Sequence, residues 1–68
     1  MVTYEELWKC REHKVKLIDV YDQVRITEVD LVESPSDSGC GQAAIGVTDS
    51  IYPDYLLQED IKSIEIID

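Results

Sequence analysis

The chain has 68 residues, 44% of them hydrophobic, and its 15 acidic and 6 basic residues give a formal net charge of −9 at pH 7. A chain this short holds one domain at most, and its apolar content argues against disorder along the whole length. No apolar run is long enough to cross a bilayer, and the first residues lack the basic and apolar parts of a secretory signal. We therefore expect one domain over residues 1–68, located in the cytoplasm and without a membrane partner.

The first predicted element is a helix over residues 3–13. Thr3 and Glu6 have the spacing of a capping box, in which each side chain pairs with the backbone amide of the other. Three large side chains then follow at helical spacing: Tyr4, Leu7 and Trp8. We expect these three to form the face that packs on the rest of the domain.

β-Branched residues in alternation follow the helix and predict five strands. The expected strands span residues 14–21, 23–33, 42–48, 51–57 and 62–67. The Ser- and Gly-containing stretch between the second and third strands is expected to be a loop. Pro53 predicts either that the fourth strand lies at an edge of the sheet or that the strand begins at this proline.

The apolar phase changes within the first two strands. In the first strand it changes at Ile18, which predicts either a strand that is covered on both faces or a bulge near that residue. The second strand places two apolar residues on one face and two on the other: Val24 and Ile26, then Val29 and Leu31. We expect a bend or bulge at Thr27 and Glu28, as a small closed barrel requires.

Three segments carry a resemblance to a known family: Lys14-Val15-Lys16-Leu17-Ile18-Asp19, Val29-Asp30, and Gln58-Glu59-Asp60-Ile61-Lys62-Ser63-Ile64-Glu65-Ile66-Ile67. In order and spacing they resemble the Sm-like superfamily, especially small Sm-like proteins of Gram-positive bacteria. The resemblance implies a mainly β fold, with a short N-terminal helix followed by a five-stranded, strongly bent antiparallel barrel of the SH3-like or Sm-like kind.

The chain departs from this family where the family binds RNA. Gln23 and Thr27 stand at the places where Sm-like RNA binders usually have glycine. The turn Gln58-Glu59-Asp60 is acidic, whereas the family's uridine pocket has a basic or glycine-containing turn there. We therefore carry over the fold and not the RNA pocket.

The charge distribution also disfavours nucleic acid as a partner. Residues 28–68 carry ten acidic residues and one basic residue, a balance that repels phosphate backbones. The opposite sign gathers in one stretch only: Lys9, Arg11, Lys14 and Lys16. That stretch is a candidate contact for RNA or DNA, and a solvated helix end explains it equally well.

The sequence predicts no catalytic residue, no metal ligand and no cofactor. Cys10, His13 and Cys40 are three potential zinc ligands, but structural zinc sites usually show paired ligands on both sides. We expect two free thiols and a histidine at the helix end. No nucleophile and base stand in a recognisable arrangement, so we do not expect an enzyme.

The aromatic residues admit two interpretations. Trp8 and the tyrosines at positions 4, 21, 52 and 55 are candidates for a groove that binds a peptide or a methylated lysine. The alternative is that Trp8 and Tyr4 cap the barrel as part of its core. A core without phenylalanine favours the second interpretation.

These observations predict a non-enzymatic barrel that acts as a protein-interaction or self-assembly module. The last strand has isoleucines in both phases, more apolar surface than one inward face needs, which predicts pairing between copies in a dimer or ring. The candidate edge residues are Ile64, Ile66 and Ile67. The alternatives are an RNA- or DNA-contacting Sm-like protein that uses residues 9–16, and an acidic mimic of nucleic acid.

Overall fold

The computed structural model describes residues 2–49 and 52–68, and the chain there is mainly β. A short helix is followed by five strands, with one helical turn after the second strand and one after the fourth. The elements are α1 (Tyr4–Lys9), β1 (Lys14–Asp19), β2 (Val24–Glu33), α2 (Pro35–Ser38), β3 (Ala44–Asp49), β4 (Tyr52–Leu57), the 3-10 turn η1 (Gln58–Asp60) and β5 (Ile61–Ile66). The prediction of an N-terminal helix followed by five strands is therefore confirmed.

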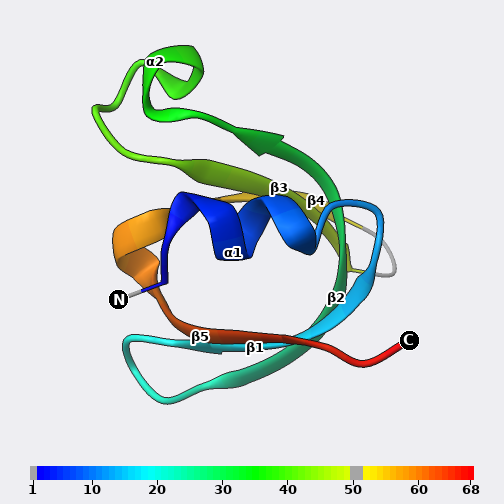
Figure 1. Ribbon diagram of the computed structural model, residues 1–68. Coiled ribbons are helices and arrows are strands. Elements are labelled where there is room, and N and C mark those ends of the chain that lie inside the picture. Colours follow the sequence, from blue (N-terminus) through cyan, green and yellow to red (C-terminus); the bar gives the residue numbers. More distant parts are fainter. Residues whose placement is uncertain (1, 50–51) are drawn as a thin grey trace.

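In the described part of the chain, the strand pairs are antiparallel and form one open sheet in the order β4-β3-β2-β1-β5. β4 and β5 do not pair there, so the sheet is not the closed barrel that the phase change in the second strand led us to expect. The sheet is strongly curved and α1 lies in front of it in the view of Figure 1, while the end of β2 and the start of β3 project with α2 away from the rest. β4 and β5 are the two edge strands, in line with the proline in β4. Most strand bounds differ from the expected ones by one or two residues, and residue 51 lies outside the described residues.

The helix is shorter than predicted. Thr3 caps it as expected, since its hydroxyl accepts a hydrogen bond from the Glu6 amide. However, α1 ends at Lys9 and not near His13. Glu12 lies in the left-handed region at φ 65° and donates its amide to the Val29 carbonyl, so the chain leaves the helix to join β2.

The packing face of the helix is also narrower than predicted. Leu7 is completely buried, whereas Trp8 is 51% exposed and Tyr4 is 36% exposed. The expectation that all three pack inward, with Trp8 and Tyr4 as core, is wrong. A helix of six residues presents little more than one side chain to the sheet, and Val2 and Cys10 complete the contact from its two flanks.

The interior of the curled sheet holds the core. Its buried residues come from the N-terminal segment, from β1, β2, β3 and β5, and from the residue before β3: Val2, Leu7, Cys10, Val15, Leu17, Val29, Ala43, Ile45, Val47 and Ile61. Gln58 fastens the N-terminal segment to this core. Its side-chain amide donates to the Val2 carbonyl at 2.7 Å and accepts from the Ala43 amide at 3.2 Å.

Two irregularities set the curvature of the sheet. The predicted bulge near Ile18 is confirmed, because the pairing of β1 with β5 shifts between Ile18 and Asp19. In β2 the shift occurs between Val29 and Leu31, later than expected. At Thr27, where we expected the irregularity, the strand keeps its regular alternation and the side chain points into the core. It is buried, and its hydroxyl donates to the Thr48 carbonyl at 3.0 Å.

The bulge in β2 turns Leu31 outward. Val29 is fully buried, but Leu31 is 44% exposed, so the expectation that the two share a face is wrong. Because two residues of β2 stand opposite one residue of β3 at this point, the side chains beyond the bulge change faces. The segment after β2 also differs from the expected loop, since Ser34 caps the single turn of α2.

Candidate functional site

The predicted self-association residues lie on the edge strand β5 or directly after it. Ile64 is half-buried and packs against the core, so it contributes little free surface. Ile66 is 41% exposed and Ile67 is 42% exposed. The Ile67 amide donates to the Lys14 carbonyl at 2.9 Å, which extends the pairing with β1 beyond the end of β5. The free apolar surface of this edge is therefore at its C-terminal end.

The predicted basic stretch is divided between two elements. Lys9 ends α1, and Arg11 follows in the turn, with its guanidinium carbon 5.5 Å from the centre of the Trp8 ring. Lys14 and Lys16 are exposed on the same face of β1.

Acidic residues stand beside both strand lysines. Lys14 pairs in register with Glu28 of β2, and Lys16 pairs with Glu65 of β5. These acidic neighbours reduce the net positive field on the β1 part of the stretch.

The three candidate zinc ligands are in different surroundings. Cys10 is a buried free thiol, and burial, followed by the nearby charge of Glu6, raises its pKa. Cys40 is an exposed free thiol after α2. The Nδ1 atom of His13 lies 3.0 Å from an Asp68 carboxylate oxygen. Across residues 2–49 and 52–68, no three His, Cys, Asp or Glu side chains gather as a metal-binding group.

The aromatic residues do not form one groove in the described part of the chain. Tyr4 and Trp8 lie next to each other on α1, with ring centres 6.4 Å apart, and line a hollow of about 240 Å³ with Glu5 and Lys9. Tyr55 lies on β4 and lines a different hollow. The side chain of Tyr52 lies outside the described residues.

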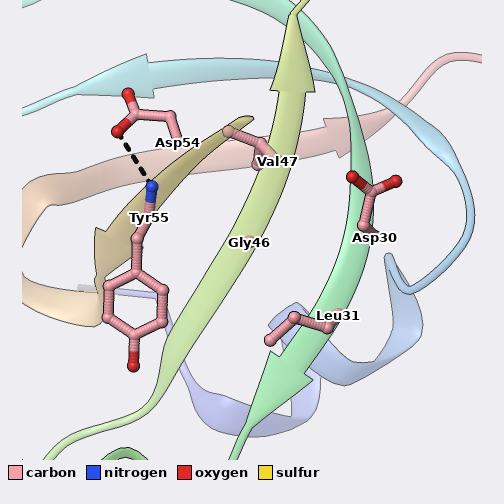
Figure 2. A pocket seen from close by; sticks show the side chains of 6 residues that line it. All are labelled: Asp30, Leu31, Gly46, Val47, Asp54 and Tyr55. Atoms are coloured by element: carbon pink, nitrogen blue, oxygen red, sulfur yellow. Dashed lines mark hydrogen bonds between the residues drawn. The ribbon is translucent and has the colours of Figure 1, made fainter. Parts of the chain in front are cut away.

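Described residues of β2, β3 and β4 line a hollow on the outer face of these strands, and we call it the Gly46 groove. It measures about 460 Å³, within the roughly 300–1,000 Å³ range of small-ligand pockets. Its lining residues are Asp30, Leu31, Gly46, Val47, Asp54 and Tyr55 (Figure 2). The sequence alone does not reveal this groove, because Leu31 reaches the outer face only through the bulge in β2.

Gly46 gives the groove its floor. It pairs in register with Leu31 on one side and Tyr55 on the other, and both of these side chains are nearly half exposed. A Cβ atom at Gly46 would lie 3.0 Å from Cγ of Leu31, so a larger residue would displace the leucine. The missing side chain leaves an apolar trough between an aliphatic wall and an aromatic wall.

Two acidic residues, Asp30 and Asp54, are among the lining residues, and Glu33 lies beside the wall formed by Tyr55. Asp30 accepts a hydrogen bond from the Thr48 hydroxyl, and Glu33 bonds the Tyr55 hydroxyl, which raises the pKa of the tyrosine. Asp54 pairs with Arg25 at 2.9 Å. This hydrogen bond to Arg25, together with the one from the Tyr55 amide, lowers the pKa of Asp54.

No family model, curated protein or solved structure matches this chain. Within the described ranges, no helix is long and apolar enough to span a membrane.

Proposed function

We propose that this chain is a non-enzymatic Sm-like barrel that self-assembles by pairing the β4 edge of one copy with the β5 edge of the next. The observation that carries the proposal is the strand order, which leaves β4 and β5 as the two edges of an open sheet. Unpaired edge amides and carbonyls are templates for pairing with another chain.

The geometry of the edges favours a ring over an isolated pair. β4 and β5 are different surfaces, so pairing one with the other is head-to-tail, and repetition of such a contact closes a ring when the rotation allows it. The exposed Ile66 and Ile67 provide apolar surface at one of the two edges. Burying these isoleucines between copies would stabilise the contact in addition to the backbone hydrogen bonds that strand addition supplies.

Charge opposes this assembly and therefore sets its salt dependence. Each copy carries a net charge of −9, and acidic residues accompany both edges: Asp54 on β4, then Glu65 and Asp68 in the C-terminal segment. The Debye length, beyond which salt largely screens the repulsion between charges on neighbouring copies, is about 8 Å at physiological ionic strength and about 30 Å at 0.01 M salt. The assembly should therefore weaken as salt is removed.

Light scattering coupled to gel filtration at 10 mM and 150 mM salt tests the proposal. We expect a multiple of the chain mass that falls toward the monomer at the lower salt. Ile67→Glu should weaken association by about tenfold or more, because it adds a like charge where apolar surface is buried. Val24→Glu is the matched control, since Val24 is 59% exposed on β2, away from both edges.

Two outcomes would contradict the proposal. The first is a strict monomer at high protein concentration in both buffers. The second is an equal loss of association in Ile67→Glu and Val24→Glu, because that result would assign the effect to overall charge and not to the β5 edge.

A further inference from the structure

We propose that the Gly46 groove binds an extended, arginine-bearing segment of a protein partner, with one aliphatic side chain over Gly46 and an arginine toward each end. This site lies on the outer face of β2, β3 and β4, and its aromatic wall, Tyr55, belongs to the edge strand β4 through which copies would pair.

The first feature that supports this occupant is the shape of the groove. Gly46 is in the middle of β3, with Leu31 of β2 and Tyr55 of β4 as its neighbours in register. In Figure 2 these two side chains lie on opposite sides of β3, and Leu31 is close to Gly46, with its Cγ atom 3.0 Å from the position that a Cβ atom at Gly46 would take. An aliphatic side chain placed there would contact apolar atoms on both sides and backbone below. Ligand pockets in proteins are usually concave and lined mainly by apolar groups, as this trough is.

The second feature is the position of the charges along the groove. The Asp30 carboxylate bonds Thr48, two residues beyond Gly46 on β3, and so marks one end. Glu33 pairs in register with Ala44, two residues before Gly46, and so marks the other end. Along an antiparallel strand, four residues span roughly 13 Å. The two carboxylates therefore bracket the trough at about the spacing of residues i and i+4 in an extended peptide.

The third feature is which charges are available to a ligand. Asp54 is paired with Arg25, whereas Asp30 and Glu33 bond only neutral hydroxyls among the contacts described. From position 28 onward the only basic residue is Lys62, so this part of the chain has a large excess of acidic residues. This field attracts a cationic segment and repels nucleic acid.

The fourth feature selects arginine over lysine. A guanidinium offers a planar fork that matches a carboxylate, and it stacks on aromatic rings. The Tyr55 side chain is 46% exposed and presents such a ring beside Glu33. The aliphatic stem of arginine also packs on apolar surface, which suits the wall that Leu31 forms.

A labelled, capped peptide, Gly-Arg-Ser-Leu-Ser-Arg-Gly, tests the proposal by fluorescence anisotropy against the full chain. We expect saturable binding that weakens as salt rises, opposite to the salt dependence of self-assembly. Replacing both arginines of the peptide by neutral citrulline should weaken binding by about tenfold or more. Placing the two arginines next to each other should also weaken it, because the charges would no longer reach both ends of the groove.

The protein variants separate the groove from general charge attraction. Asp30→Asn with Glu33→Gln removes two charges but retains acceptors for Thr48 and Tyr55, so the fold should be preserved. We expect this double variant to bind the peptide about tenfold more weakly. The matched double variant Glu59→Gln with Glu65→Gln removes two charges outside the groove and should change binding by less than about threefold. Gly46→Ala should also weaken binding, because its methyl group enters the trough.

Three results would overturn the proposal. The first is no binding by the unmodified chain at about 1 mM peptide. The second is an equal loss in the two double variants, which would show attraction by net charge alone. The third is occupation of the groove by another ligand. If RNA occupied the groove, a uridine hexamer would shift the amide NMR signals of Leu31 and Gly46. If a second copy of the chain occupied it, the Asp30→Asn and Glu33→Gln variant would lose self-association.

Discussion

Leu7 and Trp8 are neighbours in the sequence, yet only Leu7 belongs to the core. Leu7 has no exposed surface, whereas half of Trp8 is exposed and lies beside Arg11. Leu7→Ala should lower the free energy of unfolding by about 2–5 kcal/mol, since it opens a cavity in the core. Trp8→Ala should cost about 1 kcal/mol or less. Urea unfolding followed by circular dichroism measures both, and an equal cost would contradict the packing of α1.

The two cysteines should differ strongly in reactivity. Burial raises the pKa of Cys10, so its thiol is both less accessible and less often ionised near neutral pH. Cys40 is exposed. Iodoacetamide labelling followed by peptide mass spectrometry should modify Cys40 at least about tenfold faster in the native protein. The difference should vanish in denaturant, and equal native rates would show that Cys10 is not part of the core.

At the scale of elements, the ion pair between Arg25 and Asp54 joins β2 to β4 across β3. Hydrogen bonding to Arg25 lowers the pKa of Asp54 in the folded chain. As the pH falls, the Asp54 carboxylate is therefore protonated in the unfolded chain before it is protonated in the folded chain. The stabilisation is therefore fully present above the ordinary aspartate pKa of about 3.9 and is lost as the pH falls through the lower folded value.

Thermal melts between pH 6 and pH 3 test this linkage. The unmodified chain should lose more stability across that range than Asp54→Asn, by about 1 kcal/mol or less because the pair is partly exposed. Glu59→Gln serves as a control that retains the pair. Identical pH profiles for the unmodified chain and Asp54→Asn would contradict the role of this contact.

The existence of the elements could be predicted from the sequence better than their ends and faces could. The capping pattern at Thr3 and Glu6 and the alternation of β-branched residues are local signals. The helix start and the five strands that they predict are both confirmed. The end of α1 depends on the hydrogen bond from Glu12 to Val29, a contact that local periodicity does not encode. Likewise, the bulge before Leu31 depends on the pairing of β2 with β3, which one strand alone does not reveal.

The same limit applies to the candidate sites. The position of Ile66 and Ile67 at an edge could be anticipated, because a run of isoleucines in both phases exceeds what one buried face requires. The Gly46 groove could not be anticipated. Its walls come from two strands that are separated by β3 in space and by more than twenty residues in the chain, and its aliphatic wall depends on the bulge.

At the scale of the whole molecule, the two proposals respond to salt in opposite directions. Copies of a chain with a net charge of −9 repel one another, so screening favours their association. A cationic segment is attracted to the same field, so screening weakens its binding. Measurements at two ionic strengths can therefore distinguish the two events in one preparation, and the matched variants assign each event to its surface.

Residue-resolved amide hydrogen exchange at two protein concentrations in 150 mM salt tests the pairing of edges most directly. If β4 of one copy pairs with β5 of the next, amides of both strands should exchange more slowly at the higher concentration. Amides of the central strand β2 should exchange at the same rate at both concentrations. Concentration-independent exchange in β4 and β5, or a gain of protection confined to other strands, would contradict assembly through these edges.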